Sequence, residues 1–311
     1  MTFTTLIDAE SLRGLVDGSA ASAALAVAGR PGLAARPGLA SRPAVLLDCR
    51  FDLSNPAAGH QAYVTAHIPG AFHADLNRHL AAPVTADSGR HPLPSAGGLR
   101  EFFGALGIGD DTQVIAYDDA NGSLAARAWW LLRWLGHFQV AVLDGGFKAW
   151  VASGGAVERG EPVRAAAPGV ATGLTTPLRP ETVVSTADVS RALRDPNRLL
   201  VDARAAERFA GSVEPLDPVA GHVPGAVNHP FSSNLESDGR FLPAAELRRR
   251  WLERLDGTAP GDVVLMCGSG VTACHDLLAM EIAGLPGAVL YAGSWSEWIR
   301  DPQRPVARGN D

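Results

Sequence analysis

The feature that most constrains the fold of this chain is an internal repeat, because the second half follows the first half motif by motif. Four pairs of segments match in the same order: residues 46–50 with 199–204, 66–71 with 221–226, the apolar run before Asp118 with the run before Cys267, and 143–150 with 290–298. The offsets within the four pairs lie between 148 and 155 residues. Four matches in one order at a nearly constant offset indicate a duplicated domain.

Short apolar runs alternate with helix-like segments in each half. The strands expected are 45–47, 113–117, 140–143, 199–202 and 263–266, and the helices expected are 4–16, 97–106, 124–135, a short one ending at 150, and 274–282. Strands alternating with helices predict the α/β class, with a mainly parallel sheet flanked by helices in each of two tandem domains. Loops at the carboxyl ends of such strands host the chemistry, and Asp118 and Cys267 occupy that place in their halves.

The domain bounds follow from the repeat and from composition. We expect a first domain at 1–155, a linker at 156–179 that is rich in Gly, Pro, Ala and Thr, and a second domain at 180–311. Residues 17–43 are rich in Ala, Gly, Pro and Arg and offer little to bury, which indicates a low-complexity insertion at the surface.

Charge and cysteine content narrow the class of protein. The net charge of −6 comes without a cluster of Lys and Arg, which argues against a nucleic-acid partner. Three cysteines without metal-ligand spacing argue against a disulfide framework and a metal site, and favour a reducing compartment. No leader-like N-terminus and no apolar run near 18 residues is present, so we expect no membrane partner and a cytoplasmic location.

The segment 267–273 (CGSGVTA) places a cysteine between an apolar run and a helix-like segment. Its two glycines allow a tight turn that aims several N–H groups inward, and the helix N-terminus adds a partial positive charge. We expect this environment to stabilise the Cys267 thiolate and lower its pKa. The alternative is a buried structural cysteine.

Four motifs together resemble the tandem-domain rhodanese-like sulfurtransferases, the family of 3-mercaptopyruvate and thiosulfate sulfurtransferases. They are residues 66–71 (AHIPGA), 143–147 (LDGGF), 221–226 (GHVPGA) and 267–273. The resemblance implies an inactive first domain, a catalytic second domain and a site in the cleft between them. It also implies a Cys267 persulfide, a small anionic sulfur donor and no cofactor. The implied acceptor is a thiol or cyanide, with a thioredoxin-like protein among the candidates.

The cysteine loop also bears on the donor. Mercaptopyruvate enzymes of the family typically carry this same loop, whereas thiosulfate-preferring relatives carry an Arg-Lys pair after the cysteine. The departing sulfite of thiosulfate gains from nearby cations, and Gly268 and Ser269 supply none. We therefore expect 3-mercaptopyruvate as the donor, with thiosulfate as the alternative.

The resemblance assigns further site residues. The loop expected to hold the donor and the persulfide comprises Gly268, Ser269, Gly270, Val271 and Thr272, with Thr272 also expected to cap the following helix. Arg208 matches the arginine that binds the donor's anionic group, and a bidentate guanidinium–carboxylate pair explains that choice. A second arginine is often found before the second His-x-Pro-Gly motif, but residues 214–220 contain none.

His91 matches a histidine that reaches the cleft from the first domain. We expect His91 to form a proton relay with Ser269, and we expect the imidazole of His91 to titrate near neutrality. An acidic residue completes this set in some relatives, and its position here is Asn77, with Asp75 two residues earlier. The alternative for Ser269 is that its hydroxyl only hydrogen-bonds the backbone of its own loop. The alternative for His91 is that it is an exposed loop residue without a catalytic role.

Several polar residues occur in both halves and are therefore expected to be structural. They are Asp48 and Asp202, expected to hydrogen-bond loop amides, and His67 and His222, expected to hydrogen-bond within turns.

Two rival functions remain. A cysteine phosphatase needs an arginine six positions after the cysteine, where this chain has Ala273. The second rival is a non-catalytic module that senses sulfide or redox state; the retained cysteine and complete loop weigh against it, although an intact site alone does not prove turnover.

Overall fold

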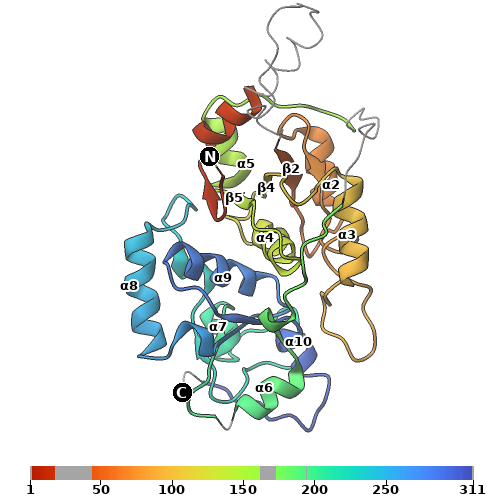
Figure 1. Cartoon of the computed structure of the whole chain (residues 1–311). Coiled ribbons are helices and arrows are strands. Elements are labelled where there is room, and N and C mark those ends of the chain that lie inside the picture. The colour runs from red at the N-terminus through yellow and green to blue at the C-terminus, as the bar shows by residue number, and fades with distance from the viewer. Residues whose placement is uncertain (1, 18–43, 162–172, 194, 310–311) are drawn as a thin grey trace, which may run out of the picture.

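The computed structural model describes residues 2–17, 44–161, 173–193 and 195–309 and contains two sheets, each flanked by helices (Figure 1). Of the expected insertion 17–43, only residue 17 is described, and it ends a helical stretch at 9–17. Asp8 accepts a hydrogen bond from the N–H of Ser11, as an N-cap does, 2.8 Å away. Part of the expected linker also lies outside the described residues, so the domain bounds stay a prediction.

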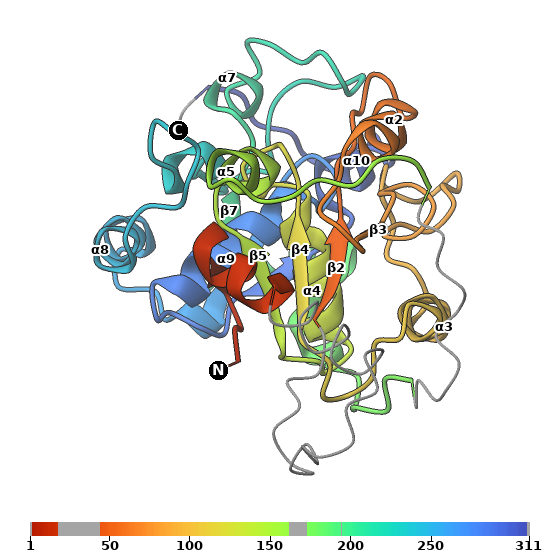
Figure 2. The ribbon, with the colours of Figure 1, turned by 90° about the horizontal axis from the view of Figure 1, so that it is seen from above.

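The first sheet has five strands, all parallel, in the order β1-β5-β4-β2-β3. Figure 2 shows β5, β4, β2 and β3 side by side. Its strands are β1 (Leu6–Ile7), β2 (Val45–Asp48), β3 (Phe72–His73), β4 (Val114–Tyr117) and β5 (Val140–Leu143). The helices of this half are α2 (Ala58–Thr65), α3 (Ala96–Ala105), α4 (Ala125–Trp134) and α5 (Gly146–Ala152).

The second sheet repeats the first strand for strand, in the order β6-β10-β9-β7-β8, again all parallel. Its strands are β6 (Val183–Val184), β7 (Leu199–Asp202), β8 (Val227–Asn228), β9 (Val263–Met266) and β10 (Val289–Tyr291). The helices are α6 (Thr186–Ala192), α7 (Ala206–Phe209), α8 (Ala244–Leu255), α9 (Thr272–Ile282) and α10 (Ser294–Trp298), with 3-10 turns at Pro180–Thr182, Phe231–Asn234 and Pro260–Asp262. The predicted α/β class with two tandem parallel-sheet domains is confirmed.

Burial explains why the central strands were visible in the sequence and the outer ones were not. Every residue of β2, β4, β5 and β9 is buried, and such continuous apolar runs are typical of parallel strands covered on both faces. The outer strands β1, β3, β6 and β8 are only two residues long, which is too short for a periodic signal.

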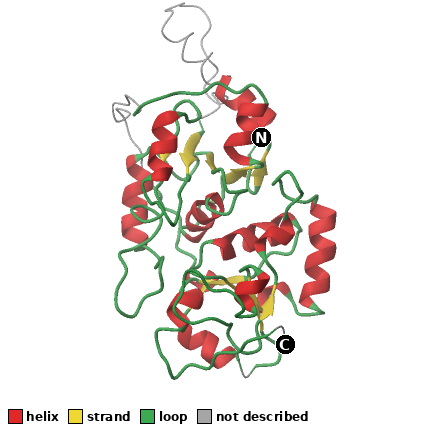
Figure 3. Cartoon of the chain, turned by 180° about the vertical axis from the view of Figure 1, so that it is seen from behind, coloured by secondary structure: helices red, strands yellow, loops and turns green. Residues whose placement is uncertain are grey.

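Helices α4 and α9 pack against each other between the two sheets, which Figure 3 shows as separate groups of strands. One buried apolar cluster accordingly contains Trp129 and Leu132 of α4 together with Leu277 and Leu278 of α9. At its edge Arg133 pairs with Glu281 at 2.9 Å. The two halves therefore share a core. Within the described ranges, no helix is long and apolar enough to cross a membrane.

The paired polar residues have the same structural role in both halves. The His67 and His222 backbone N–H groups each donate to a carbonyl near the end of their half, Glu158 and Ala307, over 2.9 Å. The rings of both histidines are buried, and Nδ1 of each lies 2.8 Å from a backbone carbonyl.

Asp48 and Asp202 accept the expected loop N–H, from Arg50 and Arg204 respectively. Each carboxylate also forms an ion pair with the guanidinium of the same arginine, at 2.5 and 2.6 Å. These ion pairs were not expected from the sequence.

Candidate active site

Cys267 directly follows strand β9 and begins the loop that leads into α9. The side chain is buried, and the Gly270 N–H donates a hydrogen bond to its Sγ over 3.1 Å. The Cys267 N–H donates to Ser294 Oγ at 3.1 Å, and the Cys267 carbonyl accepts from the Trp295 N–H at 3.0 Å. Helix α10 therefore fixes the backbone of the cysteine, while an amide of its own loop contacts the sulfur.

Gly270 is the loop residue whose geometry most requires glycine. Its φ is +77°, and a Cβ at this position would lie 2.4 Å from the Ala292 carbonyl oxygen. Both a left-handed backbone and the close approach of Ala292, the residue after β10, therefore exclude an unstrained side chain here. In this conformation the Gly270 N–H points at the Cys267 sulfur.

Asp118 occupies the end of β4, the place that Cys267 occupies at the end of β9. Its fully buried carboxylate accepts four backbone N–H groups, from Ala120, Gly122, Leu124 and Ala125, at 2.8–2.9 Å. Burial raises the pKa of this carboxyl, against the opposing effect of the amides. The first half therefore keeps an amide-lined turn but fills it with its own carboxylate.

His91 and Ser269 meet across the domain boundary, as predicted. His91 Nδ1 and Ser269 Oγ share a hydrogen bond of 2.7 Å, and both side chains are buried. Burial, followed by the charges of Arg127 and Arg90, lowers the pKa of His91 to about 3. The expectation that this histidine titrates near neutrality is therefore wrong, because burial and the two guanidinium charges hold its pKa well below neutral pH.

The expected acidic support of His91 is not found at either candidate position. Asp75 is buried and accepts the N–H groups of Asn77 and Arg78 at 2.9 Å, while the Asn77 side chain is exposed. Neither forms a hydrogen bond with His91, and all three residues are described. These two positions organise their own turn.

Thr272 also differs from expectation. It is the first residue of α9, the N-cap position belongs to Val271, and no side chain caps this helix. Thr272 instead lines the pocket above the cysteine loop, as Val271 does. Because the chain enters α9 directly from the tight turn, no extended residue precedes the helix to act as a cap.

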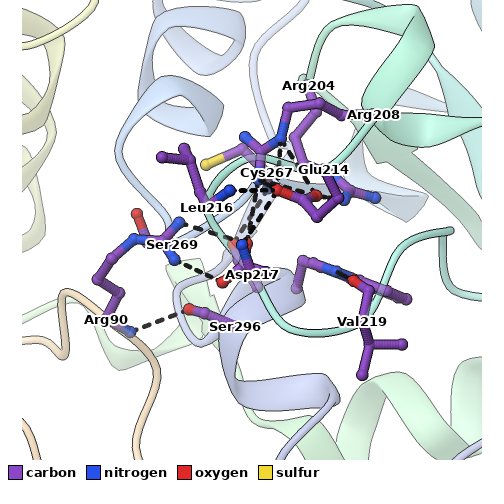
Figure 4. A network of polar contacts seen from close by, with 12 residues as sticks. Arg90, Arg204, Arg208, Glu214, Leu216, Asp217, Val219, Cys267, Ser269 and Ser296 are labelled. Carbon is purple, nitrogen blue, oxygen red and sulfur yellow. Dashed lines mark hydrogen bonds and ion pairs between the residues drawn. The ribbon is translucent and has the colours of Figure 1, made fainter. Parts of the chain in front are cut away.

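Arg208 lies in this pocket, where it was predicted. Its Nε and Nη2 bind both oxygens of Glu214 at 2.8–3.2 Å, and Nη2 also contacts Asp217 at 3.0 Å. A Cβ added to Gly268 would lie 3.4 Å from Arg208 Nη1. Figure 4 shows these residues around Cys267. The free edge of the guanidinium therefore faces the first residue after the nucleophile.

Two arginines of this site were not identified from the sequence. Arg90, next to His91, also lines the pocket, and its Nη2 would lie 3.1 Å from a Cβ at Gly268. Arg127 is fully buried in α4 and donates to the Gly270 carbonyl at 2.9 Å. The cysteine loop carries no cation of its own, but these two reach it from the first domain. The sequence signal for Arg127 was weak, because it is one of two arginines, with Arg133, in a largely apolar helix segment.

The other thiols lie outside the pocket. Cys274 is fully buried in α9 and donates from Sγ to the Gly270 carbonyl at 3.3 Å, and burial raises its pKa to about 12. Cys49 is buried at the end of β2, and burial raises its pKa as well. All three cysteines are free. Among the described residues, no cluster of three His, Cys, Asp or Glu side chains could hold a metal ion.

The rhodanese-like domain model matches residues 35–153 and 185–301 of this chain. A Pseudomonas aeruginosa protein named "Probable 3-mercaptopyruvate sulfurtransferase" is 50% identical over 270 residues, covering 86% of this chain and 93% of that protein. The thiosulfate sulfurtransferase of Bos taurus is 33% identical over 285 residues, covering 85% and 88%. The solved structure of 3-mercaptopyruvate sulfurtransferase from Leishmania major superposes with a TM-score of 0.73 at 32% identity, covering 82% of this chain and 70% of that one. Two matched domains and these relatives show that the chain belongs to the tandem-domain rhodanese-like sulfurtransferases.

Proposed function

We propose that the protein is a 3-mercaptopyruvate sulfurtransferase that carries sulfur as a persulfide on Cys267. The observation that carries this proposal is the Cys267 thiol, which receives the Gly270 N–H and lines a pocket with Arg208. The relatives named for 3-mercaptopyruvate support the donor. As a member of this family the protein takes sulfur from a donor and passes it to a thiol or cyanide.

In the first half-reaction the Cys267 thiolate attacks the thiol sulfur of the donor. A sulfur–sulfur bond forms, the carbon–sulfur bond breaks, and its electron pair leaves on pyruvate as the enolate, which takes up a proton. The loop amides hold the negative charge of the persulfide, in the way that four amides hold the Asp118 carboxylate in the first domain. The residues proposed to bind donor and persulfide are Arg208 and the loop Gly268, Ser269, Gly270, Val271 and Thr272.

Ser269 is the proton-transferring group in this proposal. Its hydroxyl is bonded to His91, and both residues line the pocket with Cys267. Because His91 stays neutral, it orients the Ser269 hydroxyl through their hydrogen bond and does not act as a stored acid. Ser269 then hydrogen-bonds the donor and relays the proton of the donor's thiol to the enolate, so that its own hydroxyl is restored.

In the second half-reaction an acceptor thiolate attacks the terminal sulfur of the persulfide. A new sulfur–sulfur bond forms on the acceptor, the bond to Cys267 breaks, and the Cys267 thiolate is restored. We propose a small thiol or a thioredoxin-like protein as the acceptor.

Thiosulfate is the second candidate donor, and a specific observation favours keeping it. Arg90 places a guanidinium beside Gly268, where the sulfite leaving group would gain from a cation. Comparing kcat/KM for the two donors separates the candidates. Efficient turnover of thiosulfate with poor turnover of mercaptopyruvate would overturn our choice.

Intact-mass spectrometry tests the proposed chemistry directly. Treatment with mercaptopyruvate should add about 32 Da, the mass of one sulfur, to the wild-type chain, and the acceptor should remove it. Cys267→Ser should show no adduct, while Cys274→Ser should keep it. If the wild-type chain forms no adduct with either donor, the protein is not a sulfurtransferase, and the non-catalytic module that senses sulfide or redox state becomes the favoured function.

A further inference from the structure

A cavity of about 110 Å³ lies where the two halves meet, and it shares no residue with the pocket of Cys267. Three parts of the chain form its walls: the end of α4, residues 179–182, and the second half of α9 with the turn that leads to β10. Leu277, Met280 and Leu285 give the cavity an apolar side. An apolar protein cavity of about 150 Å³ admits benzene, so this space suits one small ring.

The tryptophans on the first-half side of the cavity leave one hydrogen bond unmade. The rings of Trp130 and Trp134 stack with their centroids 5.8 Å apart and 14° between their planes. The indole N–H of Trp134 is buried, and no described residue accepts a hydrogen bond from it. Trp129, which also lines the cavity, donates instead to the Thr4 carbonyl at 2.9 Å. Because buried donors in folded proteins have partners, the Trp134 N–H indicates an acceptor from outside the described residues.

Two arginines line the same cavity and lie close to each other. Arg133 pairs with Glu281 at 2.9 Å, and Arg179 pairs with Glu181 at 3.0 Å. Both guanidiniums also contact the ring of Phe138, with 4.9 and 5.3 Å to its centroid. Burial lowers the pKa of Arg133, Glu281 opposes that shift, and the charge of Arg179 adds to it. An anion bound beside these two like charges would relieve their repulsion.

Residues 179–182 bring one of these guanidiniums next to the unpaired indole. The Arg179 backbone N–H donates to the Trp134 carbonyl at 2.9 Å, which ties the two residues together. Arg179 bonds Glu181 through Nε alone, and its Nη1 and Nη2 form no hydrogen bond with a described residue. Unused N–H donors of an indole and of a guanidinium therefore belong to neighbouring residues of one cavity.

We infer that this cavity is a binding site for a small planar aromatic carboxylate, whose oxygens accept from the Trp134 indole and the Arg179 guanidinium. A guanidinium donates to both oxygens of a carboxylate, and an aromatic ring packs well in offset or edge contact with other rings. The apolar side of the cavity and the stacked tryptophans receive the ring of the ligand. The inference does not rest on the proposed function, because the cavity and the Cys267 pocket are separate.

Nuclear magnetic resonance of the full-length protein tests this inference with benzoate as the probe. In a proton–nitrogen correlation spectrum, the Trp134 indole resonance is identified by its loss in Trp134→Phe. Benzoate should move this resonance downfield with a dissociation constant of about 1 mM, the affinity expected of so small a ligand, because the proton gains an acceptor. The indole resonances of Trp150 and Trp298 should stay fixed, since both donate to carbonyls, at 2.7 and 2.9 Å, and neither lines the cavity. A Trp134 resonance that does not move at about 10 mM benzoate would overturn the inference and leave the indole N–H to water.

Two related compounds separate the parts of the ligand. Benzamide keeps the ring and an acceptor but lacks the charge, and acetate keeps the charge but lacks the ring. At constant ionic strength each should bind at least about tenfold more weakly than benzoate. Benzamide that binds as tightly as benzoate would exclude a role for the guanidinium, and acetate that does so would exclude a role for the ring. Either result overturns the proposed class of ligand.

Arg179→Gln should raise the dissociation constant for benzoate about tenfold and leave that for benzamide nearly unchanged. Arg191→Gln is the matched control, because Arg191 also pairs with a nearby acid, Asp188, but does not line the cavity. The control should bind benzoate as the wild type does. An equal loss in both variants, or no loss in Arg179→Gln, would show that Arg179 does not contact the carboxylate and would overturn the inference. None of these outcomes depends on persulfide formation at Cys267.

Discussion

The guanidinium of Arg127 donates from Nη1 to the carbonyl oxygen of Gly270 over 2.9 Å, and so joins helix α4 of the first half to the cysteine loop of the second. Its other nitrogens donate to the carbonyls of Leu80 at 3.3 Å and His91 at 3.2 Å. Arg127 is fully buried, and within the described part of the chain no carboxylate pairs with it. Burial lowers the pKa of the guanidinium, and the nearby Cys274 and Cys267 thiols oppose that shift. A buried positive charge therefore underlies the sulfur-carrying loop.

Replacing this arginine with methionine should weaken both the fold and the reaction. Arg127→Met leaves three buried carbonyls without these donors, at about 1–3 kcal/mol each, so we expect the free energy of unfolding to fall by several kcal/mol. Urea unfolding measures that loss. The rate of persulfide formation per folded molecule should fall as well, because the Gly270 carbonyl loses its anchor and the thiolate loses a nearby cation.

Arg133→Met is the control for this change. Arg133 lies on the same helix and pairs with Glu281 across the same interface, away from the cysteine loop. We expect it to lower stability but to leave the rate per folded molecule nearly unchanged. An equal drop in that rate for both variants would show that the Arg127–Gly270 contact has no role of its own.

The Ser269–His91 pair should behave as one unit in catalysis. Ser269→Ala and His91→Asn should each lower kcat about 100-fold, as for a lost proton-transfer group. The double variant should be little worse than either single variant, because both remove the same hydrogen bond.

The pH dependence of the same variants tests the charge on His91. Because its pKa is about 3, the imidazole stays neutral from pH 8 down to pH 5. The ratio of wild-type to His91→Asn rates should therefore be constant over that range in a pH–rate profile. A ratio that falls tenfold on acidification within this range would mean that His91 takes up a proton there.

Features encoded by neighbouring residues were predictable from the sequence, whereas contacts across the domain boundary were predictable only where the family resemblance supplied them, as for His91 and Ser269. The cysteine loop is contiguous in the chain, and the repeat revealed the equivalence of Asp118 and Cys267. Arg90 and Asp217 are 127 residues apart and meet only because the first half docks on the second. The charge on His91 was misjudged for the same reason, since burial at that boundary and two arginines near it determine its pKa.

His229 should make the second half less stable in mild acid. Burial, then the charges of Arg254 and Arg250, lowers the pKa of His229 to about 4, although the Asn234 hydrogen bond opposes that shift. Between about pH 6.5 and 4 the unfolded chain therefore binds a proton that the folded chain does not. The free energy of unfolding should fall as the pH drops, by up to about 1.4 kcal/mol per pH unit from this group.

Comparison with His229→Gln isolates this contribution. His275 acts in the same direction, because burial lowers its pKa to about 3, and Asp276 acts in the opposite direction, because burial raises its pKa. Both remain in the variant. In urea unfolding at pH 7, 6 and 5, the variant should lose less stability than the wild type on acidification. Identical slopes would mean that His229 is protonated in the folded state.

Gly270→Ala should disrupt the turn that points an N–H at the nucleophile. Its Cβ would lie 2.4 Å from the Ala292 carbonyl oxygen at a φ of +77°. Gly225→Ala is a matched control in the same half, because its φ is +78° and nothing lies within 4 Å of the added Cβ. The control should lose about 1 kcal/mol of unfolding free energy and keep the persulfide rate, since only the backbone conformation is strained. Gly270→Ala should lose clearly more stability and most of the rate, because the loop must move away from Ala292 and carry its N–H off the Cys267 sulfur. If both variants lose the same stability and both form persulfide at the wild-type rate, the loop tolerates a side chain at 270 and the Gly270 N–H is not needed for the reaction.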